Sequence, residues 1–161
     1  RKHELDIKEV MDGVAPALAL AQSIGRWGNY FNQELFGRPT NLPWGLQIDQ
    51  RKRPIEYVAE ETFHPTFLYE SLWNALVVFT LIKLGKLGKL PSGLLMAAYF
   101  ALYSIGRLWI EALRIDEASN LAGLRINLWV FSAVLIASIS LLATKTKQHA
   151  ETNTTQQAHQ E

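Results

Sequence analysis

The sequence has no cysteine among its 161 residues. This absence excludes disulfide bonds, thiolate metal sites and a cysteine nucleophile on the chain, so a thiol can enter its chemistry only on a substrate. A dominant charge is also lacking: 16 basic against 15 acidic residues leave a formal net charge of +1, which argues against a nucleic-acid partner. No signal peptide is visible at the Arg1 start, and we expect a chain cut from something longer.

Long apolar runs are abundant and carry the fold prediction. Residues 66–85 and 93–113 are mostly apolar, and residues 126–143 contain no charge. Each run is about long enough to cross a hydrocarbon layer of ~30 Å. The alternative is a soluble all-α bundle, but its surface helices would carry a charged stripe at helical spacing, and 126–143 has none. The pattern predicts an all-α, polytopic helical membrane protein.

A fourth apolar segment, residues 14–31, reaches spanning length only if it includes Arg26 and Asn29. An arginine at bilayer depth costs about 2.5–3.5 kcal/mol on insertion scales, so it normally faces a protein interior or a wet cavity. Arg26 is therefore a candidate site residue from its position alone. We expect about four spans in a membrane-embedded domain of residues 1–144, namely 14–31, 66–85, 93–113 and 126–143.

Basic residues predict which ends of the spans are cytoplasmic. In a four-span arrangement, eight of the 16 basic residues fall inside the cell: Arg1, Lys2, Lys8, Lys83, Lys86, Lys89, Lys145 and Lys147. Residues 37–64, with interfacial anchors at Trp44 and Tyr57, and residues 114–125 then lie outside. The basic run 51–53 in the outer loop weakens this bias. Residues 145–161 lack large apolar side chains and are expected to form a disordered cytoplasmic tail.

The densest polar cluster is GRWGNYFNQELFG, residues 25–37, at the outer end of the first segment. On a helix, Arg26 and Asn29 are three residues apart and share a face. A guanidinium beside an amide can bind a phosphate through charge-assisted hydrogen bonds. The alternative is an ordinary helix end whose Arg26 snorkels to the lipid head groups. The residues alone favour neither interpretation.

A second cluster is HPTFLYE, residues 64–70. Pro65 favours a helix start, which places Tyr69 and Glu70 about one turn inside the span. A carboxylate there needs a cationic partner, and an arginine from another helix is the natural one. His64 has a near-neutral pKa and could be a general base, although a histidine at a helix entry is more often an interfacial or capping residue.

A third cluster follows one stripe of the span 93–113. Tyr103, Arg107 and Glu111 are spaced by four residues, and Arg114 continues the stripe with a small drift. An internal ion pair would account for Arg107 and Glu111, yet a charged stripe on a membrane helix must still face protein or water. Together the clusters place three or four cations near the outer leaflet, enough to hold one phospholipid head group.

The three motifs GRWGNYFNQELFG, HPTFLYE and YSIGRLWIEALR resemble blocks of the prolipoprotein diacylglyceryl transferase family, in the family's order. The first motif is long and specific, with Tyr30 where the family pattern has Phe. The resemblance covers nearly all of the chain except the tail. It implies the C-terminal part, spans four to seven, of a seven-span enzyme of the bacterial inner membrane. The family's active-site histidine belongs to a His-Gly-Gly motif ahead of this part, and His3 does not match it.

The resemblance implies transfer of sn-1,2-diacylglyceryl from phosphatidylglycerol to the lipobox cysteine of a prolipoprotein signal peptide, at an active site toward the outer leaflet. By motif position, the residues that match catalytic positions are Arg26, Tyr103 and Arg107. The residues that match substrate-binding positions are Arg26, Asn29, Glu34, Gly37, Glu70 and Glu111. Neither a metal nor a cofactor is expected, and the chain alone is expected to be inactive.

Two other interpretations stay open beside the transferase. The chain could be a non-enzymatic membrane protein, such as a transporter half or a lipid-binding subunit, whose intramembrane charges line a permeation path. It could also be an inactive fragment of the transferase. Transport predicts activity on a soluble solute and indifference to the lipid head group, whereas the transferase predicts dependence on phosphatidylglycerol.

Overall fold

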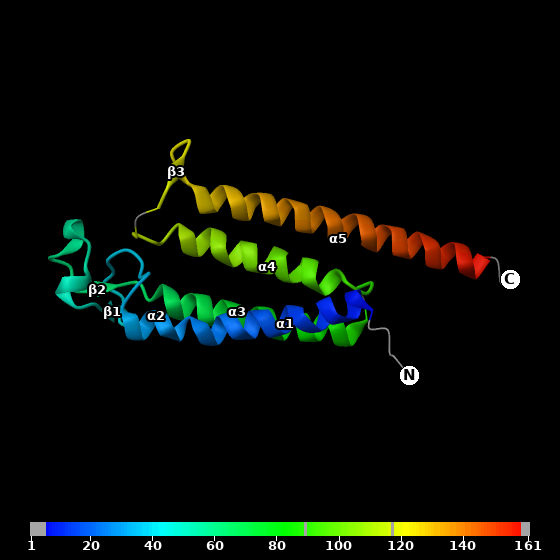
Figure 1. Ribbon diagram of the computed structural model, residues 1–161, viewed down its shortest axis with the longest axis horizontal. Helices are drawn as coiled ribbons and strands as arrows, with labels where there is room; N and C mark the ends of the chain where they lie inside the picture. The colour runs from blue at the N-terminus through cyan, green and yellow to red at the C-terminus, as the bar shows by residue number, and fades with distance from the viewer. Residues whose placement is uncertain (1–5, 89, 117, 159–161) are drawn as a thin grey trace.

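The computed structural model describes residues 6–158 apart from Lys89 and Glu117. Within this part, the four long helices run side by side along the long axis (Figure 1): α1 (Ile7–Gly25), α3 (Thr66–Leu87), α4 (Leu94–Glu111) and α5 (Ile126–Ala158). Helix α3 packs against α1 and α4, and α5 packs on α4. The prediction of an all-α, polytopic membrane protein is confirmed. Three helices are long and apolar enough to cross a membrane: α3, α4 and the part of α5 from Ile126 to Thr152.

The ends of α3 and α4 follow from local chemistry. Helix α3 begins directly after Pro65 and ends at Gly88, whose φ of +60° is a left-handed conformation that suits glycine. Helix α4 begins after Gly93, and its first amides are capped by α1. The Asp12 carboxylate accepts hydrogen bonds from the Gly93 and Leu95 amides at 2.7 and 2.9 Å. The cap therefore ties the start of α1 to the start of α4.

Helix α1 differs from the predicted segment 14–31. It begins at Ile7, where Asp6 accepts a hydrogen bond from the Lys8 amide, and it ends at Gly25. A short helix, α2 (Trp27–Asn32), follows Arg26 and stops at Gln33, which has a left-handed backbone. Helix propensity needs no apolar side chains, so the polar first turns of α1 are helical although a search for apolar runs misses them. Three of the basic residues that were predicted to be cytoplasmic lie outside the described residues: Arg1, Lys2 and Lys89. His3 lies outside them as well.

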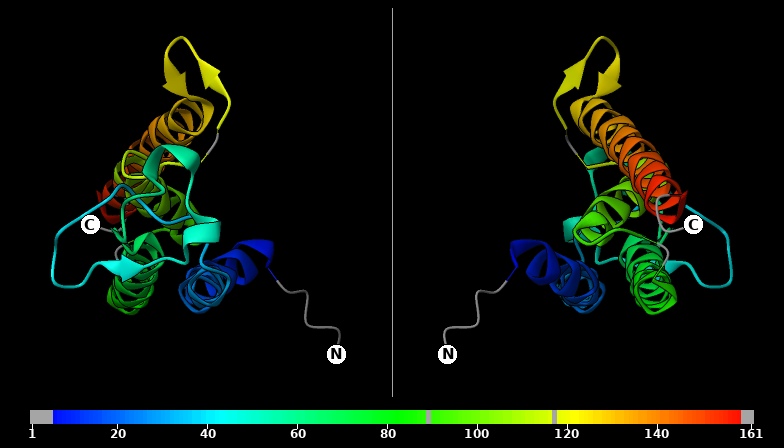
Figure 2. Two further views of the ribbon diagram at one scale, coloured as in Figure 1. Left: turned by 90° about the vertical axis from the view of Figure 1, so that its left-hand side faces the viewer. Right: turned by 90° about the vertical axis from the view of Figure 1, so that its right-hand side faces the viewer.

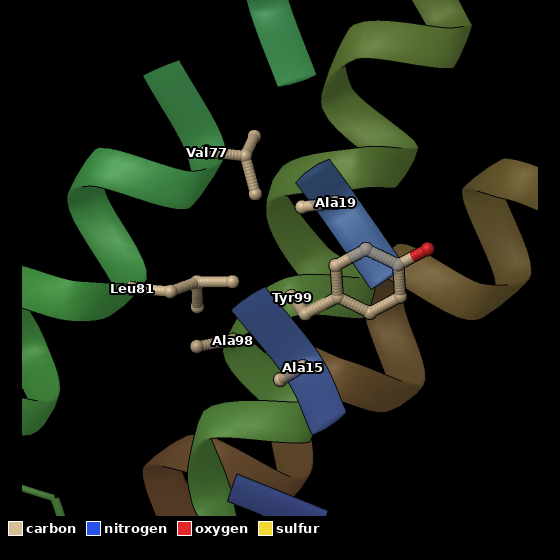
Figure 3. Close-up of a cluster of buried hydrophobic side chains, with 6 residues drawn as sticks. All are labelled: Ala15, Ala19, Val77, Leu81, Ala98 and Tyr99. Carbon is tan, nitrogen blue, oxygen red and sulfur yellow. The ribbon is translucent and has the colours of Figure 1, made fainter. Parts of the chain in front are cut away.

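Small side chains let the helices approach one another closely at the centre of the bundle. Figure 3 shows Ala15 and Ala19 of α1 facing Val77 and Leu81 of α3, with Ala98 and Tyr99 of α4 completing the cluster. Small residues at helix interfaces are the usual means of tight packing in membranes, because lipid supplies no hydrophobic force between helices. In contrast, most of the apolar side chains of α5 are exposed, as expected of a surface in contact with lipid.

The segment between α2 and α3 is a folded loop at one end of the bundle (Figure 1). Its elements are β1 (Leu46–Gln47), paired antiparallel with β2 (Thr62–Phe63), and the 3-10 turns Gln50–Lys52 and Ile55–Tyr57. It has its own small core of Phe36, Ile48 and Phe63. A second hairpin, β3 (Asn120–Leu121) and β4 (Leu124–Arg125), projects outward from the bundle just before α5 (Figure 2) and turns through Ala122 and Gly123 at positive φ.

The described part of the predicted disordered tail is helical, which corrects that expectation. Helix α5 continues to Ala158, past the predicted end of the span at residue 143. Extending a formed helix adds one hydrogen bond per residue without a new nucleation cost, so polar residues with fair helix propensity continue it. An ion pair between Lys147 and Glu151, one turn apart, adds minor support.

Candidate functional site

Glu70 is the buried carboxylate at the centre of the site. It lies in the first turns of α3 with 2 % of its surface exposed. Its Oε2 atom lies 2.6 Å from Nε of Arg26, at the α1–α2 junction, and accepts a hydrogen bond at 3.0 Å from Nη1 of Arg107 on α4. The expected arginine partner from another helix is therefore present twice. A charge buried in this way needs such compensation.

Glu111, the last residue of α4, is a second buried carboxylate. It is fully buried and forms the predicted intrahelical pair with Arg107, whose Nη2 donates to Oε2 at 2.9 Å. Its other oxygen accepts from Nε of Arg125 at 2.8 Å and from the Asn127 amide at 3.0 Å. Arg107 therefore bridges the two buried carboxylates, and Glu111 joins α4 to the start of α5.

A third carboxylate, Asp116, connects the site to the β3–β4 hairpin. It accepts two hydrogen bonds from Arg114, at 2.6 and 2.9 Å, and a third hydrogen bond from Arg125 at 3.1 Å. Burial acts to raise the pKa of the Asp116 carboxyl, but the hydrogen bonds and charges of the two arginines outweigh it and the pKa is lowered. Burial likewise acts to lower the pKa of Arg114, and its bonds to Asp116 raise it overall.

These contacts form one arginine–carboxylate cluster, whose members are Arg26, Glu70, Arg107, Glu111, Arg114, Asp116 and Arg125. Four guanidinium groups face three carboxylates, so one positive charge is left over. Two buried atoms of the cluster, Glu70 Oε1 and Arg107 Nε, have no hydrogen-bond partner among the residues that the structure describes. Unpaired buried polar atoms are costly in isolation and mark a place where a ligand could bind.

A narrow crevice between α3 and α4 opens on this cluster. Its walls include Glu70, Asn74, Tyr103 and Arg107, and it is too narrow to hold a water molecule. The buried Asn74 Oδ1 atom has no hydrogen-bond partner in the described part of the chain. The Tyr103 ring packs edge-on against Phe131, over which the Arg107 guanidinium also lies, 5.3 Å from the ring centroid. Within the described chain, no group of three or more His, Asp or Glu side chains is arranged to hold a metal ion.

Four predicted site residues lie outside the cluster: Tyr103, which lines the crevice beside it, and Asn29, Glu34 and Gly37. Asn29 is half-buried on α2, one turn beyond Arg26. Glu34 is exposed and accepts a hydrogen bond from the Asn32 amide at 3.1 Å. Gly37 is buried where the loop crosses the ends of α3 and α4: its amide donates to the His64 carbonyl, and an added Cβ would lie 2.9 Å from His64 Cβ. Gly37 therefore allows a close backbone approach, and the structure brings neither Glu34 nor Gly37 onto the cluster.

The histidine considered as a general base is engaged in the loop. Nδ1 of His64 lies 3.1 Å from the Tyr69 hydroxyl, which also accepts a hydrogen bond from Nε1 of Trp44 at 3.0 Å. Because that hydroxyl accepts from Trp44, it is free to donate its own hydrogen to His64. The described hydrogen bond of the His64 side chain is thus to Tyr69 rather than to a member of the cluster.

Sequence reasoning assigned no role in the site to Arg125, Asp116, Asn127 and Asn74. Arg125 and Asn127 flank the start of α5, 14 and 16 residues after Glu111, so no helical spacing connects them to it. One signal was available for Asn74: it is an amide in the middle of an apolar run, four residues after Glu70 and on the same helix face.

Comparison with known proteins gives a consistent family. The family described as prolipoprotein diacylglyceryl transferase matches residues 1–144. The chain belongs to this family. It is 47 % identical over 149 residues to phosphatidylglycerol–prolipoprotein diacylglyceryl transferase 2 of Streptomyces coelicolor, covering 92 % of this chain and 47 % of the relative.

Two more relatives named phosphatidylglycerol–prolipoprotein diacylglyceryl transferase are similar. The protein of Frankia alni is 50 % identical over 131 residues, which are 81 % of this chain and 34 % of the relative. That of Synechococcus sp. strain CC9902 is 56 % identical over 114 residues, 68 % of this chain and 41 % of the relative. The chain thus spans a third to a half of the length of the prolipoprotein diacylglyceryl transferases that it matches.

Proposed function

We propose that this chain forms part of an enzyme that transfers a diacylglyceryl group from phosphatidylglycerol to the lipobox cysteine of a prolipoprotein. The observation that carries the proposal is the buried arginine–carboxylate cluster, with its one surplus positive charge. A phosphatidylglycerol head group carries one negative charge and would neutralise that surplus. The relatives are named for transfer of a diacylglyceryl group between phosphatidylglycerol and prolipoprotein, which supports the proposal.

Arg26 is the arginine best placed to receive the phosphate. Its side chain is 20 % exposed, against 8 % for Arg107. Its Nε atom pairs with Glu70, while within the described chain its two terminal nitrogens make no hydrogen bond. These two donors suit a bidentate contact with a phosphate. Asn29, one turn further on, supplies a neutral amide on the same side of the phosphate.

Arg107 and Tyr103 serve the reacting end of the lipid. The cysteine sulfur attacks C3 of the diacylglyceryl group, forming a C–S bond while the bond from C3 to the phosphate oxygen breaks. Glycerol phosphate leaves with the electron pair of that bond and gains one negative charge, and the thiol loses its proton. A fixed guanidinium in a water-poor site stabilises the charge that develops on the departing oxygen. Proximity to a cation also favours the thiolate.

The proposed site belongs at the outer leaflet of the bacterial inner membrane. The cluster lies at the end of the bundle that carries the folded loop and the hairpin, opposite Lys83 and Lys86 near the end of α3. Lysine-rich connections are typically cytoplasmic. The lipobox cysteine of a translocated signal peptide would then meet the lipid on the outer side.

The test is mass spectrometry of a lipobox peptide incubated with this chain in vesicles. Parallel vesicles contain phosphatidylglycerol or phosphatidylcholine, and the chain is reconstituted alone or together with the segment of the Streptomyces coelicolor relative that it does not cover. We expect a diacylglyceryl mass gain only with phosphatidylglycerol and only with the added segment. No gain in any arm with both parts correctly inserted would contradict the proposal, as would an equal gain from phosphatidylcholine.

A further inference from the structure

A groove lies at the end of the bundle opposite the arginine–carboxylate cluster. Its wider part is a pocket of about 440 Å³ between the start of α1, the turn before α4 and the distal half of α5. The titratable side chains among its described lining residues are Lys8, Lys145 and His149, and none of these lining residues is acidic. This end of the groove is therefore cationic.

The pocket continues along the bundle as an apolar hollow of about 220 Å³. The two share the lining residues Met11, Gly93 and Leu141. The walls of the hollow are Met96, Ala97 and Phe100 of α4 and Ala137, Ser138 and Leu141 of α5. From Gly93 to Phe100, a helix rises about 10 Å. The groove thus has a cationic mouth and an apolar channel between two membrane helices.

The Asp12 carboxylate, one turn after Lys8 on α1, does not neutralise this mouth. Asp12 accepts hydrogen bonds from the Gly93 and Leu95 amides, so its charge is directed into the start of α4. Lys8 packs against the turn, with its Cβ and Cγ 3.2 Å from where a Gly93 Cβ would lie. Lys145 directly follows the apolar part of α5, at the level where lipid head groups begin.

We infer that this groove binds one anionic phospholipid of the leaflet opposite the cluster. The phosphate lies between Lys8 and Lys145, and one acyl chain lies in the channel between α4 and α5. A free phosphate would leave the apolar channel uncovered, and a zwitterionic lipid would leave the positive charge of the mouth uncompensated. The inference is independent of the proposed transferase activity, because the two sites lie at opposite ends of the bundle.

The absence of cysteine makes a site-specific test direct, since a single introduced cysteine is the one labelling position. Ser140→Cys places a fluorophore on the exposed face of α5, directly before Leu141, which lines both parts of the groove. Ile82→Cys places one on the exposed face of α3. Each labelled chain is placed in vesicles of one fixed phosphatidylglycerol and phosphatidylcholine composition. In one set of vesicles the phosphatidylglycerol is brominated, and in the other set the phosphatidylcholine is brominated. Bromine quenches the fluorophore on contact, so quenching reports which lipid lies beside the label.

We expect brominated phosphatidylglycerol to quench the label at 140 at least twofold more than brominated phosphatidylcholine, and the label at 82 equally with both lipids. The double variant Lys8→Gln/Lys145→Gln should lose the preference at 140. The matched control Lys83→Gln/Lys86→Gln removes the same charge from exposed lysines of α3, outside the groove, and should keep it.

Three results would overturn the inference. Equal quenching by the two lipids at 140 would show no selective site. Loss of the preference in both lysine variants would show diffuse attraction to positive charge. Loss of the preference when the uncovered segment of the relative is added would show that protein, rather than lipid, fills the groove.

Discussion

At the scale of single residues, the two carboxylates buried most deeply in the site are each compensated by at least two arginines. Glu70 faces Arg26 and Arg107, and Glu111 faces Arg107 and Arg125 at close range, with Arg114 as a third partner at 3.9 Å. Arg107 takes part in both sets because its planar guanidinium presents separate nitrogens to separate acceptors. A lysine ammonium at the same place carries the same charge on a single nitrogen, so it cannot present separate nitrogens to the two carboxylates.

The variant Arg107→Lys tests whether a guanidinium group is needed at this position. We expect diacylglyceryl transfer to fall about 100-fold, the loss typical of removing one charge-stabilising donor, because one ammonium cannot bridge Glu70, Glu111 and the leaving phosphate. The measurement is the initial rate of lipobox-peptide lipidation in the reconstituted assay above. Arg51→Lys, at an exposed arginine paired with Asp49, is the control and should leave the rate unchanged. Full activity of Arg107→Lys would refute a bidentate role.

The variant Glu111→Gln tests the stabilising role of the cluster. The substitution removes the charge that compensates Arg107 and Arg125 while it keeps the side-chain volume. We expect the free energy of unfolding to fall by about 3–5 kcal/mol, as when one partner of a buried ion pair is removed. Denaturant unfolding in detergent micelles, followed by circular dichroism, measures the change. Glu60→Gln alters an exposed residue and should change the stability by less than about 0.5 kcal/mol. A loss no larger than that of Glu60→Gln would mean that the pairs contribute no net stability.

The sequence was enough to predict the part of this cluster that depends on spacing. Arg107 and Glu111 are one turn apart, and the position of Glu70 inside a span required a cation. The contacts of Arg125 and Asp116 depend instead on how the connection between α4 and α5 folds back. No periodicity encodes that path, so those residues could not be assigned without the structure.

At the scale of elements, α3 and α4 approach one another closely at Gly106. A Cβ built there would lie 2.3 Å from Cδ1 and Nε1 of Trp73, and that indole donates a hydrogen bond to the Leu102 carbonyl at 3.0 Å. The absent side chain therefore makes room for Trp73 in the wall of the crevice. The packing of the two helices positions Glu70 opposite Arg107.

The variant Gly106→Ala should displace Trp73 and break its bond to Leu102. Overpacking of a core typically costs about 1–3 kcal/mol, which denaturant unfolding in micelles would report. Gly13→Ala is the control, because nothing lies within 4 Å of a Cβ at that helical position, and it should be neutral or slightly stabilising. In a double-mutant cycle, Gly106→Ala should destabilise the Trp73→Ala variant much less than it destabilises the native chain. Additive stability losses would exclude this contact as the cause.

The attachment of the β3–β4 hairpin should depend on pH through Asp116. Since the folded pKa of this carboxyl is lowered, its stabilising contribution is complete above the unfolded value near 3.8 and is lost as the pH falls through the folded value. We expect the hairpin to stay docked from neutral pH to about pH 4 and to detach below it. The fluorine NMR signal of 5-fluorotryptophan at Trp129, whose Nε1 donates to Leu121 of the hairpin, measures this. Asp116→Asn should abolish the acid transition, and a transition between pH 5 and 7 would point to a different group.

Apolar patterning predicted the elements well where the helix is apolar from end to end. The predicted starts at residues 66 and 126 are the first residues of α3 and α5, and α4 lies inside the predicted 93–113. The pattern failed at the polar ends of helices. The first turns of α1 are helical without being apolar because Asp6 caps them. The distal turns of α5 are helical without being apolar because they extend a helix that has already formed.

At the scale of the whole molecule, the bundle has two chemically different ends, and α1 reaches from one to the other. Asp12, near its start, caps α4 at the end that carries the lysines, and Arg26, just beyond its last turn, pairs with Glu70 at the end that carries the loop. Nineteen helical residues span about 28 Å, close to the hydrocarbon thickness. We therefore expect α1 to cross the membrane with α3 and α4, although it is not among the three helices that are apolar enough to cross by composition alone.

Single cysteines at Lys8, Arg51 and Lys86 test this arrangement, because the native chain offers no competing thiol. In intact cells or spheroplasts, a membrane-impermeant maleimide should label the cysteine at 51, in the loop, and leave those at 8 and 86 unlabelled until the membrane is permeabilised. If the cysteine at 8 reacted from outside while that at 86 did not, α1 would not cross the membrane. Labelling of both 51 and 86 from outside would show that α3 does not span it, and would remove the separation of the two ends on which the outer-leaflet site depends.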